Sequence, residues 1–392
     1  MRLSDHPHEA ALRASVRDWL ASRLDDARRQ SIEAAIMRGE SGPARAWQRE
    51  LFAAGYAVRS WPRVYGGGDG ALAEDLILFE ELARAEAPDD IFRVGIRNVG
   101  PVLMRLGSAF QKEQLLRGTA DGTILWSQGF SEPGAGSDLA SLQSRARLVG
   151  GRWVLRGQKV WNTFGHMADW CLFLMRTGVA ISRHRGLSAF VVPMNTPGIS
   201  VRPIPQMSGR TDFNEVFLDD VEVDSSSLVG EEGDGWKVAV AMLDFERRGL
   251  AAIGFDCLRT YRRLVRLATT LRTAGGGSLS KDPQLRRRLA ELGVQVRIAV
   301  LNNHRFAAMV PPGQPPGPEA SVQKLHATEL NKSLHGFAME LLMENTPHQP
   351  EHRANLPKVS EAWLGSFGFT IGGGTAQVQR NIIAERVLDL PR

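Results

Sequence analysis

The residue best placed for acid–base chemistry is Glu246, in the segment GWKVAVAMLDFERRGLAAIGF at 235–255. Apolar residues recur there at helical spacing, and five of them share the helix face of Glu246: Ala239, Met242, Leu243, Leu250 and Ile253. A carboxylate on an apolar face loses solvation, and such perturbed groups gather at functional sites. Two interpretations stay open from the spacing alone: Glu246 is a catalytic base, or it is a buried carboxylate paired with an arginine of another helix.

The second feature is a cluster of three glycines in TIGGGTAQVQR, residues 370–380. Glycine has no side chain to hold a neighbour away, so the cluster predicts that something approaches the backbone closely there. The glycines offer no acid, base or nucleophile. Any chemistry at this loop therefore needs a side chain from elsewhere in the chain.

Other familiar catalytic patterns do not fit. The stretch GAGSD at 134–138 does not join a strand to a helix in the manner of a dinucleotide or phosphate loop. His348 and His352 lie four residues apart in a proline-rich stretch, where we expect no metal site. The chain also lacks the Gly-x-Ser-x-Gly pattern of a nucleophile elbow.

Periodicity divides the chain into three regions. Helical spacing dominates up to about residue 120, as in Leu12, Val16 and Leu20, and it returns from about residue 232. Between them lie short strand patterns separated by turn residues, with no helix-sized segment. These are a hairpin around two glycines at 145–157 and strands at 170–177, 187–194, 199–204 and 214–223. This order predicts a small β sandwich or barrel between two helical regions.

Composition narrows the class of protein. The chain has 392 residues, 43% apolar and 23% charged, with only two cysteines, Cys171 and Cys257, so we expect a reducing, cytoplasmic setting and no disulfide framework. We see no signal-peptide segment and no apolar run long enough to span a membrane. The net charge is +5, yet basic clusters such as Arg286–Arg288 are more typical of a solvated helix face than of a nucleic-acid site.

Four segments resemble the acyl-CoA dehydrogenase family in order and spacing, and the resemblance covers nearly the whole chain. They are WSQGFSEPGAGSDLASL at 126–142, GQKVWNT at 157–163, NEVFLDDVEV at 214–223 and GGGTAQVQRNIIAERVLDLPR at 372–392. The resemblance implies an α+β fold, mostly α. Its parts are an N-terminal helical domain at 1–122, a middle β-barrel or sandwich domain at 123–230 and a C-terminal four-helix bundle at 231–392. It also implies FAD, held between the middle and C-terminal domains.

The resemblance assigns middle-domain residues to the cofactor. Ser131 matches a residue that hydrogen-bonds the flavin ring, with backbone contacts beside it. Trp161 and Thr163 match a pair that flanks the ring, although periodicity alone allows Trp161 to be a core aromatic. The full set implied in this domain is Gln128, Phe130, Ser131, Gly136, Ser137, Trp161 and Thr163.

Further residues are assigned from the C-terminal region. Thr375 and Gln377 match residues on the pyrophosphate and ribityl chain, and Arg272 matches an arginine that reaches the FAD of a neighbouring subunit. Eleven residues later the family often has glutamine, where this chain has Pro283, so the chain departs from the family at part of that inter-subunit contact. Ser137 also lies where the family meets the CoA thioester arm, and Arg247 is assigned to the substrate.

The family also implies the reaction, which is α,β-dehydrogenation of an acyl-CoA in lipid catabolism. Many members carry the base at the position of Gly373, but the isovaleryl and long-chain types carry it on the helix, at the position of Glu246. The resemblance therefore favours Glu246 as the base, with the Gly373 N–H left to stabilise the enolate. Burial should move the ionisation of Glu246 toward the operating pH, and the missing carboxylate at Gly373 should leave room near the α-carbon.

Partners follow from the same resemblance. It implies an acyl-CoA substrate, an electron-transfer flavoprotein as acceptor, and a homotetramer or homodimer. Two alternatives are a flavin monooxygenase or oxidase on the same fold, and a partner subunit of a hetero-oligomeric acyl-CoA dehydrogenase. We expect no bound metal and no nucleic-acid partner.

Overall fold

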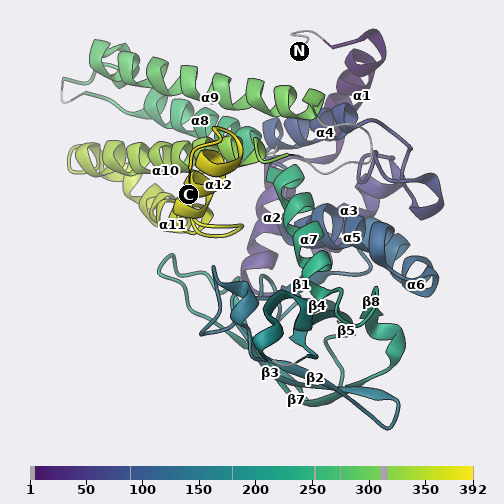
Figure 1. Cartoon of the computed structure of the whole chain (residues 1–392). Helices are drawn as coiled ribbons and strands as arrows, with labels where there is room; N and C mark the ends of the chain where they lie inside the picture. Colours follow the sequence, from purple (N-terminus) through teal and green to yellow (C-terminus); the bar gives the residue numbers. More distant parts are fainter. Residues whose placement is uncertain are drawn as a thin grey trace.

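The computed structural model describes residues 5–88, 90–178, 180–250, 253–273, 275–309 and 317–391. Figure 1 shows N-terminal helices in purple and blue, a sheet in teal, and C-terminal helices in green and yellow. No helix in the described ranges is both long and apolar enough to cross a membrane.

The N-terminal region is helical, as periodicity predicts. Val16 and Leu20 are buried and pack in one cluster with Leu78 and Leu82. Side chains cap two of the helices, since Asp25 accepts from the Arg28 N–H and Ser108 forms a capping box with Gln111. The helices are α1 (Pro7–Arg23), α2 (Asp26–Met37), α3 (Gly42–Ala53), α4 (Leu72–Arg84), α5 (Gly100–Leu106) and α6 (Ala109–Asp121), with short turns η1 (Arg63–Tyr65) and η3 (Val94–Val99).

The middle region is a bent sheet with strand order β6-β7-β3-β2-β4-β5-β8 and β1 parallel to β4. β2 meets β4 through the single pair Arg145–Arg176, and the two halves on either side of it share a buried apolar cluster. Trp153 and Phe190, one from each half, lie 5.3 Å apart between ring centroids. The strands are β1 (Trp126–Gly129), β2 (Arg145–Val149), β3 (Arg152–Lys159), β4 (Trp170–Arg176), β5 (Leu187–Pro193), β6 (Ile199–Pro203), β7 (Asn214–Val223) and β8 (Leu228–Val229).

The five predicted strand segments all form strands. Gly150 and Gly151 both have positive φ, as a tight hairpin between β2 and β3 requires. β8 was not predicted, because it has only two residues.

The C-terminal region is built around α10, which packs against α7, α8, α9, α11 and α12. α7 also packs on β4 and β5, so it connects the sheet to the helices (Figure 1). Arg286–Arg288 lie on an exposed face of α9, where Arg287 and Arg288 pair with Glu291. The helices are α7 (Gly235–Leu250), α8 (Ile253–Thr270), α9 (Pro283–Met309), α10 (Ala320–Asn345), α11 (Leu356–Phe369) and α12 (Ala376–Arg386).

A buried ion pair fixes the loop that follows β1. Lys159 is fully buried, and its Nζ lies 2.7 Å from Glu132 Oε1. Glu132 also accepts from the backbone N–H groups of Gln143 (2.6 Å) and Ser144 (2.9 Å). Burial alone would raise the pKa of Glu132, but Lys159 and these donors hold it below its ordinary value. The pair thus ties the two ends of the 130–144 loop to β3.

We predict that Glu132→Gln lowers the free energy of unfolding by about 3–5 kcal/mol, because it leaves the Lys159 ammonium buried without a counter-charge. Chemical denaturation measures this. Glu222→Gln, which weakens an exposed pair with Arg152, is the matched control and should cost under about 1 kcal/mol. Equal losses in the two variants would refute the role given to the buried pair.

Candidate active site

Glu246 and the glycine loop meet in the folded chain. Gly373 has φ +66°, and a Cβ added there would lie 2.5 Å from Glu246 Oε1. Ala239 and Met242, predicted to share the face of Glu246, are fully buried, and Glu246 itself is half-buried. The helical wheel therefore placed this carboxylate correctly on the inner face of α7.

The same geometry corrects one expectation. We expected the missing carboxylate at Gly373 to leave open room near the substrate α-carbon. The Glu246 carboxylate already stands against Gly373 on the side where a side chain would begin. The glycine thus makes space for a carboxylate on the helix and leaves no empty volume at that point.

The carbonyl groups of the loop are held from two helices. Lys324 Nζ on α10 donates to Gly374 O at 2.5 Å. Gln379 Nε2 on α12 donates to Gly373 O and Gly374 O, both at 3.1 Å. Within the described ranges no residue accepts a hydrogen bond from the Gly373 N–H. The loop therefore presents one backbone donor beside the Glu246 carboxylate.

Sequence patterns did not identify Lys324 or Gln379 as site residues. Lys324 is 1% exposed, and burial lowers its pKa to about 8, against the opposing effect of Glu246 and Glu329. The signal for its burial lay in its helix neighbours, which are small and share its face: Ala320, Ser321, Ala327 and Thr328. A lysine on such a face does not point into solvent.

Thr375 stands where the glycine loop enters α12. Its hydroxyl accepts from the Val378 N–H at 3.2 Å and caps the helix, so the hydroxyl proton stays free for a ligand. The N-terminus of a helix attracts anions, which suits a pyrophosphate. Gln377 is exposed on the first turn of the same helix.

Four of the predicted flavin residues of the middle region lie together where β1 and β3 end. The Val160 N–H donates to Ser131 O (2.9 Å), which places Trp161 next to Ser131. Ser127 Oγ donates to Thr163 O (2.9 Å), and Asn162 Nδ2 donates to Gln128 O (3.0 Å). These bonds join segments that are about thirty residues apart in the sequence.

Trp161 is not a core aromatic. It is 56% exposed and has φ 65°, a backbone region that side-chain-bearing residues rarely adopt. Such outliers persist where the surroundings hold them, often at functional sites. An exposed indole provides a flat apolar wall of the kind that a flavin ring packs on.

The remaining predicted residues are placed less closely. The Phe130 side chain is buried in the main core, and its carbonyl accepts from Lys159 Nζ at 3.3 Å, while Gly136 and Ser137 are exposed in the loop. Arg272 follows α8, whose 18 residues measure about 27 Å, so it does not join the group around Glu246. Arg247 lies on α7, but its side chain is outside the described residues.

The residues present fit FAD. Besides the exposed indole and the helix N-terminus, two buried amide oxygens, Asn162 Oδ1 and Gln379 Oε1, have no hydrogen-bond partner among the described residues. Buried polar atoms without partners call for an explanation, and ligand hydroxyl groups would supply one. No group of three or more potential metal ligands occurs in the part of the chain that the structure describes.

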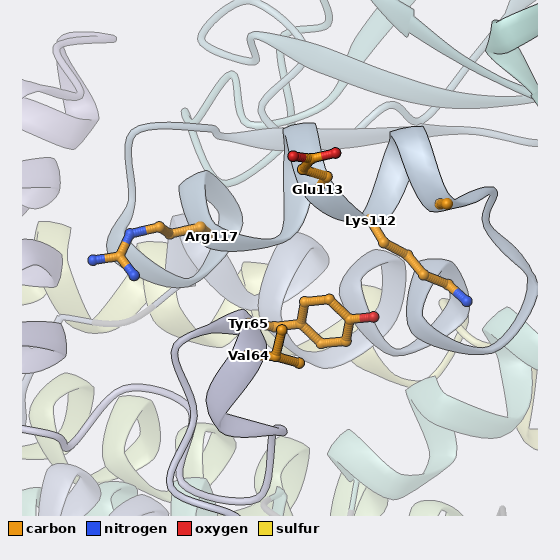
Figure 2. A pocket seen from close by; sticks show the side chains of 6 residues that line it. Val64, Tyr65, Lys112, Glu113 and Arg117 are labelled. Carbon is orange, nitrogen blue, oxygen red and sulfur yellow. The ribbon is translucent and has the colours of Figure 1, made fainter.

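Two surface hollows lie outside this group of residues. One, of about 580 Å³, borders the 132–135 loop, Ser144 and Gln158, close to Ser131. The other, of about 600 Å³, lies between η1 and α6, where Figure 2 shows Tyr65 facing the helix that carries Lys112 and Glu113. None of the predicted site residues lines the second hollow.

A bent sheet between helical regions, with a carboxylate at a glycine loop and an exposed indole beside Ser131, defines a flavin-dependent oxidoreductase. The chain belongs to the acyl-CoA dehydrogenase family. The family's N-terminal domain matches residues 6–123, its middle domain 127–221 and its C-terminal domain 233–388. The protein is accordingly an FAD-dependent enzyme that dehydrogenates acyl-CoA thioesters.

Individual relatives agree with this assignment. Acyl-CoA dehydrogenase IpdE1 of Mycobacterium tuberculosis is 39% identical over 391 residues, which cover 97% of each chain. Among solved structures, the ChsE4-ChsE5 complex from Mycobacterium tuberculosis has a TM-score of 0.84 and 31% identity. The Tcur3481-Tcur3483 steroid ACAD has a TM-score of 0.86 and 28% identity. Each of these two covers 100% of both chains.

We predict that Gly373→Ala is costly and Gly372→Ala is not. A methyl group at 373 meets Glu246 Oε1 and must adopt positive φ, so the free energy of unfolding should fall by about 1–2 kcal/mol and the carboxylate should be displaced. At 372 the nearest atom to an added Cβ is 3.7 Å away. Denaturation and flavin reduction by acyl-CoA, measured on both variants, test this, and equal behaviour would contradict the contact.

Proposed function

We propose that Glu246 is the base of the dehydrogenation and takes the α-proton of the acyl-CoA thioester. The observation that carries this proposal is the position of its carboxylate against Gly373, the place where a base on the loop would stand. When bound, FAD supplies the acceptor for the β-hydride. The α-proton of a thioester is only weakly acidic, so Glu246 needs help from a group that stabilises the enolate.

The Gly373 N–H is the proposed donor to the thioester oxygen. It has no partner among the described residues, and it lies on a loop whose carbonyl groups are held by Lys324 and Gln379. A preorganised donor of this kind is worth about 10²–10³-fold in rate. The proposed base and the proposed donor thus lie on the two sides of the contact between Glu246 and Gly373.

Cofactor and substrate contacts complete the proposal. Trp161 and Ser131 would hold the flavin ring, and Thr375 and the start of α12 would hold the pyrophosphate. Gln128, Phe130, Gly136, Thr163 and Gln377 provide the remaining cofactor contacts, and Ser137 and Arg247 meet the acyl-CoA. The domains divide at 1–122, 123–230 and 231–392, a division supported by the sheet, which lies between residues 126 and 229.

A second chain is also part of the proposal. Arg272 is exposed about 27 Å along α8 from the end near Glu246, so within one chain it cannot serve the same FAD ring. We infer a homotetramer or homodimer, or an assembly with a second acyl-CoA dehydrogenase chain, as the names of two solved relatives suggest. Electrons leave to an electron-transfer flavoprotein. Two buried free thiols, Cys171 and Cys257, support a reducing cytoplasmic setting.

We predict that Glu246→Gln folds and holds FAD but reduces its flavin about 10²–10⁴-fold more slowly, because glutamine cannot accept the proton. Stopped-flow bleaching of the flavin, with acyl-CoAs ranging from short-chain to steroid, measures this. Glu340→Gln, on an exposed face of α10, is the matched control. Flavin reduction at the wild-type rate would show that the base lies elsewhere.

A second arm moves the base back to the loop. Gly373→Glu in a Glu246→Gly background removes the carboxylate that an added Cβ would meet and introduces one from the loop side. Part of the flavin reduction lost in Glu246→Gly should return. No recovery, in a variant that still binds FAD, would count against the shared position of the two carboxylates.

We predict that the protein is at least dimeric and that Arg272→Ala lowers its FAD content. An exposed arginine lost from a neighbour's cofactor weakens binding without unfolding either chain. Native mass spectrometry gives both the assembly and the FAD per chain, and Arg286→Ala on the exposed face of α9 is the control. A stable monomer carrying a full complement of FAD would refute the shared site.

A further inference from the structure

Lys324 is a charged side chain at the centre of the C-terminal region that neither gives nor takes a proton in the reaction proposed above. It is 1% exposed, on the helix that packs against both α7 and α12. Burying an ammonium group is costly unless it is paired or hydrogen-bonded. Lys324 must therefore be compensated by the groups around it.

Its first partner is the glycine loop. Lys324 Nζ donates to Gly374 O at 2.5 Å, and Gln379 Nε2 donates to the same oxygen at 3.1 Å. Gly373 and Gly374 both have positive φ, a backbone shape that three-glycine sequences adopt readily but do not hold by themselves. The ammonium group therefore supplies part of the rigidity that the loop's sequence lacks.

Its second partner is electrostatic. The charged groups that act on Lys324 are Glu246 from α7 and Glu329 on its own helix. Burial lowers the pKa of Lys324 to about 8, while the two carboxylates oppose that shift, so the lysine is mostly protonated at neutral pH. An ammonium that interacts electrostatically with Glu246 favours the ionised carboxylate, which is the form a base needs.

We propose that Lys324 is the positioning residue of this active site: it holds the glycine loop against Glu246 and sets the pH range in which Glu246 is ionised. The proposal rests on Glu246 being the base. It adds a third group, on α10, that acts on both halves of the catalytic contact. A lysine with a merely structural role would change stability alone.

Three substitutions separate the two tasks. Lys324→Met removes the donor and the charge, Lys324→Gln keeps a donor without the charge, and Lys324→Arg keeps both. Lys358→Met, an exposed lysine of α11 that lies 3.6 Å from Glu33, is the control. All are purified with FAD, and the rate of flavin reduction by acyl-CoA is followed against pH.

Lys324→Met should reduce its flavin about 10²-fold more slowly, the size of effect that a misplacement of about 1 Å produces. In both neutral variants the acid limb of the pH profile should move to higher pH, because the charge that favours the carboxylate is gone. Lys324→Arg should keep the limb at the wild-type pH. A wild-type rate and limb in Lys324→Met overturns the proposal, as does a limb that moves equally in Lys324→Arg.

Hydrogen–deuterium exchange tests the loop without turnover. Residues 370–376 should exchange faster in Lys324→Met than in the wild type or Lys358→Met, and Lys324→Gln should restore part of the protection. Unchanged exchange overturns the positioning role, even if no acyl-CoA reduces the wild-type flavin. A wild-type flavin that no acyl-CoA reduces would instead contradict the proposed function, so the two failures are distinguishable. If Lys324→Met does not fold, the Gln and Arg variants decide both points.

Discussion

The contact between the Glu246 carboxylate and Gly373 is the constraint on which the rest of the site depends. It requires α7 to present its inner face to the start of α12, and it requires a backbone at 373 that no side chain obstructs. α10 satisfies the first requirement by packing against both helices. The glycine cluster satisfies the second, and neighbouring side chains must then supply the order that glycine cannot.

The sheet also helps to hold Glu246 against Gly373, because it packs on α7. α7 packs on β4 and β5, so the sheet that carries the proposed flavin residues helps to fix the position of Glu246. The ends of β1 and β3 are joined by backbone and amide hydrogen bonds, and the Lys159–Glu132 pair fixes the loop between them. The proposed flavin residues and Glu246, which are far apart in the sequence, are thereby held in fixed positions relative to each other.

Periodicity in the sequence identified the features that depend on a repeating pattern of residue types. It could not identify features that depend on a single contact. Glu246 was found because its apolar neighbours recur at helical spacing, and the β2–β3 hairpin because two glycines interrupt an alternating pattern. β8 was missed because it has only two residues. Trp161 is exposed and has a positive φ just after β3, and no repeating sequence pattern indicates either feature. Lys324 was missed because lysine usually lies in water, although its small neighbours marked a buried face.

The contact at Gly373 also constrains how the position of the base can change in evolution. The site has two possible forms, with the base at 246 or at 373. A chain with glutamate at both positions would bring a new side chain against an existing carboxylate oxygen, at a backbone position of positive φ, so it would be strained. Passage from one form to the other by single substitutions therefore runs through either a strained chain with two bases or a chain with none. The second kind would still fold and still offer its cofactor and thioester contacts. It would be a ready-made silent subunit, and a gene copy trapped at that step would need an active relative beside it to be kept.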